Sequence, residues 1–297
     1  MFLRWLRAGF RFVGKVVLGV VLVLSTLFGG MWLARPARVP VEEPLFQGVS
    51  YRRLIKDSPR PVVIHVAEID LTAPGIQLKV TPPDPAEGRE LRASTTREFL
   101  RRYDLQLAIN GSFFDPFIPG GLFNYYPHSG DPVNVMGQST SDGVTYSNSD
   151  GKRGTLCILK GNQAIFVRGT CPEGVEQALA GHLLLVDEGK VAKPKDFDPE
   201  PRTVVGIDRS GKRLSLVVVD GRQAGYSEGL SMQELADLCA ELGLYTALNL
   251  DGGGSSTMVR ERWLYPALIN APIHTRIPLR ERPVANHLGV MALPLED

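Results

Sequence analysis

A strand, helix, strand and glycine-turn unit in the C-terminal half constrains the fold more than any other feature. A valine-rich apolar run over residues 214–220 is followed by Ser231, which has capping-box spacing to a glutamate three residues later. Apolar residues then recur at helical period, and Gly243 closes the helix as a C-terminal glycine. A short strand over residues 245–248 leads into Asn-Leu-Asp-Gly-Gly-Gly-Ser-Ser-Thr-Met, residues 249–258. The unit predicts a helix-covered sheet with a glycine turn at a strand end.

The polar groups around this turn predict a binding site. An amide and a carboxylate lie two residues apart, and therefore on one side of a strand. The glycines allow backbone conformations closed to other residues and let another group approach closely. The groups are, in order, Asn249, Asp251, Gly252, Gly253, Gly254, Ser255, Ser256 and Thr257. This combination suits an anion or a sugar, and the alternative is a solvated polar hairpin.

A second apolar run also ends in a glycine turn. Residues 105–109 predict a buried strand, and Asn110-Gly111-Ser112-Phe113-Phe114 follows it. Asn110 could supply hydrogen bonds to a ligand, with the two phenylalanines as a wall. The alternative is a tight turn pinned by two core phenylalanines.

Several ordered motifs carry a resemblance to a known family. They are Arg202-Thr-Val-Val-Gly-Ile-Asp208, Asp220-Gly-Arg222, Gly225-Tyr-Ser-Glu-Gly-Leu230, the glycine turn, Asn110-Gly-Ser-Phe-Phe114 and Arg282-Pro-Val-Ala-Asn-His-Leu-Gly-Val290. In these motifs the chain resembles the phosphodiester glycosidase domain family, over roughly residues 61–293. Ser112 stands where the family has a second glycine, which narrows the backbone freedom of that turn.

The resemblance implies hydrolysis of a glycosyl phosphodiester. Such a site needs a carboxylate, donors for the phosphate and a place for the sugar. Asp251 is the expected catalytic carboxylate, and Asp220 is either a second one or a turn residue. The expected substrate-binding residues are Asn110, Gly111, Arg202, Asn249, Gly252, Gly253, Gly254, Ser255 and Ser256. Arg202 either binds phosphate through its guanidinium or is a solvated strand-edge charge.

Cofactor requirements and other function classes stay open at this point. A calcium or magnesium ion bridging Asp251 and a phosphate is conceivable, although no cation-loop spacing is present. A non-catalytic module that binds a glycan or phosphate with the same residues is the alternative to an enzyme. A nucleotide-binding sheet is disfavoured because no Gly-x-Gly-x-x-Gly opens a helix.

The N-terminal segment predicts a membrane anchor. Residues 16–34 carry no charge over 19 positions, and Arg4, Arg7, Arg11 and Lys15 precede them. This pattern predicts a cytoplasmic segment over residues 1–15, a single span and an extracytoplasmic domain, periplasmic or extracellular. A cleaved signal peptide is the competing interpretation, but Trp32 lies where a small residue would be needed.

The remaining chain predicts a proline-rich linker and one domain. Residues 35–60 read as the linker, and residues 61–297 as a single sheet-rich mixed α/β domain with few helices. Residues 62–69 and 76–80 are expected to pair as a hairpin, and Thr95 to cap a helix. Residues 116–151 form a long irregular stretch whose aromatic side chains stack on a sugar or cover the core edge. These aromatic residues are Phe117, Phe123, Tyr125 and Tyr126.

Charge and cysteine content narrow the partners. The net charge of +1, from 33 basic and 32 acidic residues, gives no field that favours nucleic acid. The expected partners are a sugar phosphodiester or cell-envelope glycan and the membrane. Cys157 and Cys171 could form a disulfide outside the cytoplasm, and Cys239 lies on the apolar face of its helix.

Overall fold

The computed structural model describes residues 15, 17–23, 25–26, 29–122, 124–195, 197–263 and 265–296, in two compact units, residues 1–36 and 37–297. In the first unit, residues 15, 17–23, 25–26 and 29–33 are helical. No helix formed by the described residues is long and apolar enough to span a membrane, so the expected span over residues 16–34 is not confirmed. Residues 1–14, and four residues of the expected span (16, 24, 27 and 28), lie outside the described part.

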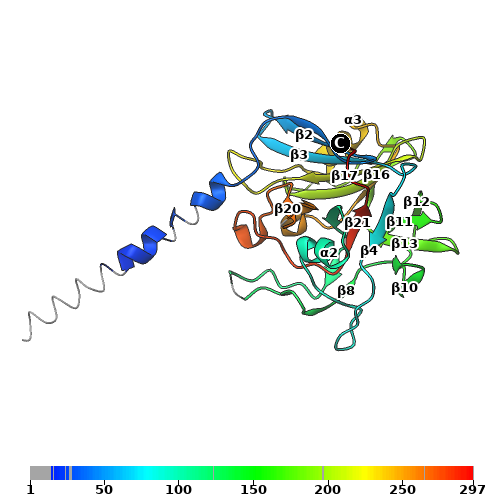
Figure 1. Ribbon diagram of the computed structural model, residues 1–297, viewed down its shortest axis with the longest axis horizontal. Helices are drawn as coiled ribbons and strands as arrows, with labels where there is room; N and C mark the ends of the chain where they lie inside the picture. The colour runs from blue at the N-terminus through cyan, green and yellow to red at the C-terminus, as the bar shows by residue number, and fades with distance from the viewer. Residues whose placement is uncertain are drawn as a thin grey trace, which may run out of the picture. The chain divides into compact units, whose positions relative to one another are not determined.

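An antiparallel sheet forms the larger layer of the second unit (Figure 1). In the described chain it has eight strands in the order β1-β2-β3-β17-β16-β18-β14-β15. Their bounds are β1 Val41–Phe46, β2 Val49–Lys56, β3 Val62–Asp70, β17 Arg213–Val219, β16 Arg202–Ile207, β18 Thr246–Asn249, β14 Leu184–Asp187 and β15 Lys190–Val191.

Two five-stranded sheets and a small sheet lie among the other described residues. One has the order β20 (Ala267–Leu268), β19 (Met258–Arg260), β6 (Leu107–Asn110), β21 (His287–Met291) and β4 (Gln77–Val80). The next has β10 (Val144–Ser147), β9 (Ser139–Ser141), β13 (Val175–Ala180), β11 (Gly154–Leu159) and β12 (Gln163–Arg168). The smallest has β5 (Leu91–Arg92), β8 (Pro132–Val135) and β7 (Phe114–Asp115).

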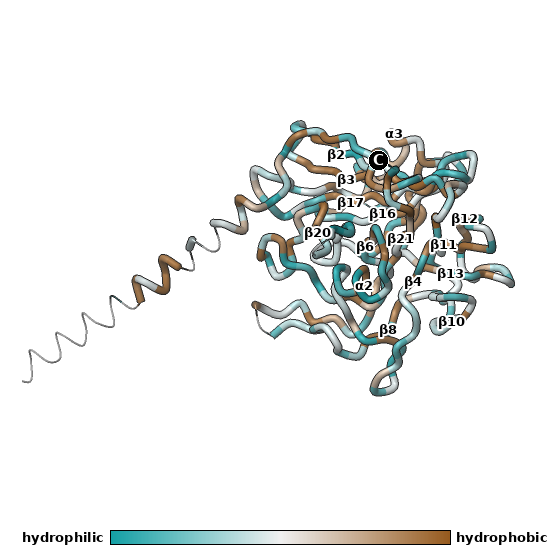
Figure 2. The backbone as a smooth tube through the Cα atoms, viewed as in Figure 1, coloured by the Kyte–Doolittle hydropathy of each residue, from teal (hydrophilic) through white to brown (hydrophobic). Residues whose placement is uncertain are grey.

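The main core lies between the eight-stranded sheet and the two five-stranded sheets. Side chains alternate along β3, so Ala67 and Ile69 join this core while Ile64 and Val66 join the core under α3 (Met232–Glu241). Helix α2 (Thr96–Arg102) packs on β6 and β19 through Phe99 and Leu100. Apolar residues concentrate on the strands and polar residues on the connecting loops (Figure 2). The prediction of a sheet-rich domain with few helices is confirmed.

Both predicted capping boxes are present. Ser231 accepts from the backbone of Glu234 at the start of α3, and Glu234 accepts from Ser231 N–H in return. Thr95 and Glu98 make the same reciprocal pair at α2. Two short 3₁₀ helices, η1 (Gly253–Ser255) and η2 (His274–Arg276), lie in the C-terminal part.

The linker expected over residues 35–60 is wrong from Val41 onward. Strands β1 and β2 pair with each other, and β2 continues the sheet beside β3. Pro44 lies within β1, and a proline is tolerated there because β1 is an edge strand of the sheet. The compact unit therefore begins near Ala37.

The expected hairpin between residues 62–69 and 76–80 is also wrong. Strand β3 lies between β2 and β17, whereas β4 pairs with β21 in a different sheet. One edge of β3 forms a hairpin with the preceding β2, and the other edge pairs with β17 from far along the chain.

The cysteine alternatives are resolved. Cys157 and Cys171 form a disulfide with Cα atoms 5.7 Å apart, and Cys239 is a free, buried cysteine on α3. Burial raises the pKa of the Cys239 thiol far above its usual range, so this thiol is an inert part of the core.

We expect Ser231→Ala to lower the free energy of unfolding by about 1 kcal/mol, because an N-terminal N–H of α3 loses its acceptor. Urea denaturation measures this change. Ser231→Asp, which keeps a capping oxygen, should stay within about 0.5 kcal/mol of the wild type. Equal losses in both variants would contradict the capping argument.

Candidate functional site

Asn110 joins the two predicted glycine turns. Its Nδ2 donates to the carbonyl oxygen of Asp251 at 2.7 Å, and its Oδ1 accepts from Thr203 Oγ1 at 2.9 Å and Thr257 N–H at 3.1 Å. The backbone N–H of Asp251 donates to the Gly111 carbonyl at 3.0 Å. The ends of β6 and β18, which belong to different sheets, are thereby held together.

The glycine turn presents the carboxylate of Asp251. Asp251 Oδ2 accepts from Ser255 Oγ at 2.5 Å, and Oδ1 accepts from Gly252 N–H at 3.0 Å. The turn continues as η1, in which Gly253 has φ +60°. The aspartate side chain is thus oriented by its own turn, and 9% of the residue is exposed.

Two arginines from distant segments meet consecutive glycines of this turn. A Cβ on Gly254 would lie 2.6 Å from Arg282 Nη2, and a Cβ on Gly253 would lie 3.1 Å from Arg222 Nη2. The missing side chains therefore allow both guanidinium groups to reach the backbone. Arg222 also forms an ion pair with Glu200.

Arg282 connects the carboxylate to an aromatic region. Its Nη1 donates to Ser255 Oγ at 3.0 Å, and its Nε donates to His274 Nδ1 at 3.3 Å. Its guanidinium carbon lies 4.4 Å from the centre of the Phe117 ring. The Tyr125 ring packs edge-on against His274, with the ring centroids 4.6 Å apart.

Burial and charge act in opposite directions on these groups. Burial raises the pKa of Asp251 above its ordinary value, although Arg282 and the Ser255 hydrogen bond oppose the shift. Burial also lowers the pKa of Arg282, and Arg222 adds to this effect. A carboxyl with a raised pKa beside two cations is suited to acid/base chemistry on an anion.

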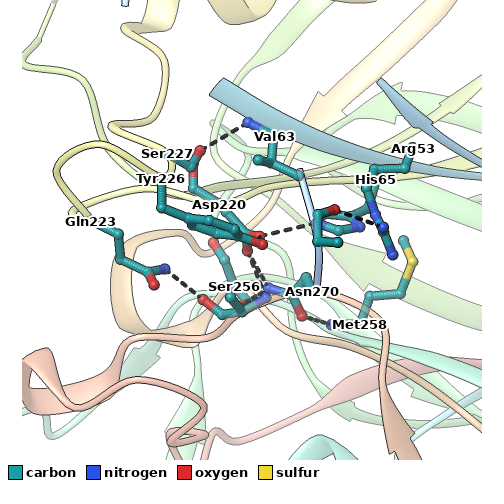
Figure 3. A network of polar contacts seen from close by, with 12 residues as sticks. Arg53, Val63, His65, Asp220, Gln223, Tyr226, Ser227, Ser256, Met258 and Asn270 are labelled. Carbon is teal, nitrogen blue, oxygen red and sulfur yellow. Dashed lines mark hydrogen bonds and ion pairs between the residues drawn. The ribbon is translucent and has the colours of Figure 1, made fainter. Parts of the chain in front are cut away.

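Asp220 lies in a separate buried network (Figure 3). Its Oδ1 accepts from Asn270 Nδ2 and from Ala271 N–H, both at 2.9 Å. Its Oδ2 lies 3.0 Å from His65 Nε2 and accepts from the Tyr226 hydroxyl at 3.4 Å. Both carboxylate oxygens are therefore occupied by protein groups, which favours a structural role for Asp220.

The Asp220 network nevertheless holds the residues that follow the glycine turn. Asn270 also donates to the Ser256 carbonyl at 3.0 Å and accepts from Met258 N–H at 2.8 Å (Figure 3). Ser227 Oγ links the Asp220 carbonyl to Val63 N–H in β3. Asp220 thus holds the segment that follows the glycine turn against the eight-stranded sheet.

The other predicted site residues lie close to the turn with different surroundings. Arg202 donates from Nε to the Leu230 carbonyl at 2.9 Å and from Nη2 to the Asp198 carbonyl at 3.2 Å. Gly111 packs so closely that a Cβ would lie 2.5 Å from Asn286 Oδ1. Buried side-chain oxygens of Asn249 (Oδ1) and Ser256 (Oγ) have no hydrogen-bond partner among the described residues. Arg202 and Gly111 therefore both contact protein groups around the turn.

Of the aromatic residues predicted within residues 116–151, some contact the site and one joins a core. Tyr125 and Phe117 pack on His274 and Arg282, whereas Tyr126 joins a small core with Phe114. Phe123 lies outside the described residues. Phe113 contacts His182, with ring centroids 5.8 Å apart.

For a divalent cation, the turn offers one carboxylate, Asp251. The described residues contain no group of three or more His, Cys, Asp or Glu arranged to hold a metal ion. Both Asp251 oxygens already accept hydrogen bonds from Ser255 and Gly252. A cation bound here would need oxygens from the substrate as well.

Arg222, Arg282 and His274 are functional candidates that sequence reasoning did not select. Arg222 closes the Asp-Gly-Arg motif and Arg282 opens the Arg-Pro-Val-Ala-Asn-His motif. An arginine in each of two matched motifs was the available signal. No local pattern marked His274.

The architecture defines a sheet-rich α+β protein with a polar site where strands of two sheets end. The chain belongs to the phosphodiester glycosidase family, since residues 103–291, more than half of its 297 residues, match the model of that family. The resemblance in the motifs is thereby confirmed. A comparison with curated proteins gives no match.

Solved structures share the fold. The catalytic domain of zebrafish N-acetylglucosamine-1-phosphodiester alpha-N-acetylglucosaminidase, auto-inhibited by its pro-peptide, matches with TM-score 0.63 and 21% identity, covering 90% of this chain and 92% of that chain. A hypothetical protein from Synechocystis matches with TM-score 0.63 and 16% identity over 86% of this chain, which spans 64% of that protein. A putative exported protein from Burkholderia pseudomallei gives TM-score 0.60 and 14% identity, over 88% and 98%.

We expect the thermal stability of the wild type to fall relative to that of Asp251→Asn as pH rises. The folded protein holds the Asp251 proton to higher pH than the unfolded chain, whose aspartate pKa is about 3.9. The contribution of this carboxyl is therefore complete at low pH and is lost as pH rises through the folded pKa. Melting temperatures of both proteins between pH 4 and pH 8 measure the difference. A difference that is constant, or that moves the other way, would contradict the raised pKa.

Proposed function

We propose that the protein hydrolyses a sugar-1-phosphodiester bond, giving a free sugar and a phosphomonoester. The observation that carries the proposal is the meeting of Arg222, Arg282 and the carboxyl of Asp251 at one glycine turn. Membership of the phosphodiester glycosidase family supports it. The zebrafish protein with the same fold is named for this reaction on N-acetylglucosamine.

The two guanidinium groups are the phosphate-binding candidates. Both face the same turn, and Arg222 adds to burial in lowering the pKa of Arg282. Glu200 pairs with Arg222, and Arg282 reaches Asp251 only through Ser255. A phosphodiester anion between the arginines would relieve their repulsion and accept bidentate hydrogen bonds.

Cleavage at the anomeric carbon leaves the second negative charge on the departing phosphomonoester. Arg222 and Arg282 would stabilise this developing charge, which contributes more than protonation because the leaving group is a weak base. Asp251, with its raised pKa, would exchange a proton with water or the leaving oxygen. Arg202, whose guanidinium donates to backbone carbonyls, would position the turn.

We further propose an extracytoplasmic location on a membrane anchor, with a cell-envelope glycan or related metabolite as substrate. The Cys157–Cys171 disulfide supports an oxidising compartment. The basic residues Arg4, Arg7 and Arg11 before an uncharged stretch support an inside N-terminus. Protease digestion of spheroplasts, in which the outer surface of the cytoplasmic membrane is accessible, should cleave the domain, and protection until that membrane is lysed would overturn this placement.

The reaction is tested by free-sugar release from a panel of aryl α-N-acetylglucosamine-1-phosphodiesters and uridine-diphosphate N-acetylglucosamine. We expect turnover by the wild type and by Asp237→Asn, which changes an exposed aspartate on α3. Asp251→Asn should lose about 10³-fold or more in kcat. No turnover on any member, with sugar-phosphate binding unchanged in Asp251→Asn, would instead support the non-catalytic binding module.

Lysine variants of the three arginines test which of them binds the phosphate. Arg282→Lys and Arg222→Lys should each lower kcat/KM by about 10²-fold, because lysine cannot make the bidentate contact. Arg202→Lys should mainly lower the melting temperature, since its donors hold the Leu230 and Asp198 carbonyls. A larger rate loss for Arg202→Lys than for Arg282→Lys would show that Arg202 is the phosphate ligand.

A further inference from the structure

His274 is a buried histidine with one ring nitrogen held and the other unpaired. Arg282 Nε lies 3.3 Å from Nδ1, whereas Nε2 is buried and has no hydrogen-bond partner in the described part of the chain. A guanidinium nitrogen can only donate, so Nδ1 must be the acceptor. A neutral His274 therefore carries its proton on Nε2, and this N–H is the unsatisfied group.

The surroundings keep the imidazole neutral. Burial, together with Arg282, Arg280 and His128, lowers the pKa of His274 to about 3. The groups around it are Arg280 and Arg282 on its own segment, Tyr125 and His128 on the facing loop, and Ser255 at the glycine turn. Across the ordinary pH range the ring is thus a hydrogen-bond donor at Nε2 that neither gains nor loses a proton.

The backbone that carries His274 is strained. Thr275, Arg276 and Leu279 have φ of 51°, 61° and 61°, in the left-handed region that non-glycine residues rarely adopt. The segment is held by His274 N–H donating to the Arg280 carbonyl at 3.0 Å. Strain of this kind persists where the surrounding structure fixes a functional side chain. A tight strained turn that places a buried, unpaired donor needs an explanation beyond packing.

Aromatic rings lie beside this donor. The Tyr125 ring is nearly perpendicular to the imidazole, at 81°, and its hydroxyl accepts from Arg280 Nη2 at 3.0 Å. Phe117 covers the guanidinium of Arg282 and is 40% exposed. Aromatic faces next to fixed polar groups are the usual lining of small-molecule sites that bind an apolar face with polar edges. A sugar ring has both.

We propose that His274 Nε2–H is a hydrogen-bond donor to an oxygen of the substrate's sugar ring, a hydroxyl or an N-acyl carbonyl, next to the phosphate at Arg282. The inference rests on the proposed function, since it places the sugar beside the arginine that binds the phosphate. His274 donates without transferring its proton, and Arg282 fixes the tautomer. Tyr125, which covers the imidazole in the free protein, shifts to admit the sugar.

The first test uses the full-length protein with His274→Gln and His274→Phe, on whichever panel substrate the wild type turns over. Glutamine places an amide N–H near the position of Nε2–H, whereas phenylalanine keeps the ring shape without a donor. We expect kcat/KM to fall about 10- to 100-fold in His274→Phe and less than about 5-fold in His274→Gln, with an unchanged pH profile in the glutamine variant. His128→Gln, which changes an exposed histidine against the same Tyr125 ring, is the matched control and should match the wild type.

Two kinetic outcomes would overturn the proposal. Wild-type activity in His274→Phe would show that Nε2–H only points at the Tyr125 ring. Equal losses in both His274 variants, with one limb of the pH profile removed, would show that the imidazole transfers a proton.

The second test needs no turnover and no substitution. Nitrogen-15 NMR of the wild type labelled at histidine should show His274 protonated at Nε2 from pH 5 to pH 9. Addition of α-N-acetylglucosamine 1-phosphate should shift this Nε2–H signal more than inorganic phosphate does, because phosphate alone reaches the ring only through Arg282. A shift of the Nε2–H signal without turnover on the panel would contradict the proposed reaction but support the hydrogen bond from His274 to the sugar. Turnover with an unchanged Nε2–H signal, or no response of this signal to the sugar phosphate, would contradict that hydrogen bond.

Discussion

The hydrogen bonds of Asn110 are the constraint on which the site depends. One amide side chain ties the end of β6 to Thr203 in β16 and to both ends of the glycine turn. Because β6 and β16 belong to different sheets, this contact sets how the two sheets meet at the site. Replacing this buried amide would leave its hydrogen-bond partners unpaired and would lower the free energy of unfolding. Its position at a strand end therefore supports assembly of the site.

The glycine turn held by Asn110 brings a carboxyl group and two guanidinium groups close together. Glycines 253 and 254 leave room for Arg222 and Arg282, and the turn itself orients Asp251. Burial disfavours charge on both groups, so it raises the pKa of Asp251 and lowers the pKa of Arg282. In the proposed reaction the phosphodiester supplies the anion that faces the two arginines, and the attacking water supplies a proton that Asp251 can exchange. Asp220 contributes from a distance, by holding Asn270 under the same turn.

Sequence reasoning succeeded where the cause is local. The capping boxes at Thr95 and Ser231 depend on residues three apart, and both helices begin where predicted. The glycine turn after β18 was recognised from adjacent residues in the same way. It failed for β4, whose partner β21 lies about two hundred residues further along the chain. The edge position of β1, which made Pro44 acceptable, likewise follows only from the completed sheet.

By itself the sequence determined the family, the sheet-rich domain and the turn that presents Asp251, because these depend on motifs of a few consecutive residues. Only the tertiary structure decided which side chains meet at that turn. Arg282 and His274 approach Asp251 from a segment about twenty to thirty residues later, and Arg222 approaches from one about thirty residues earlier. Arg202 and Asp220 fit the same motifs, yet their polar atoms are engaged by backbone and buried side chains. Polar atoms choose partners by distance in the folded chain, and spacing along the sequence does not encode that distance.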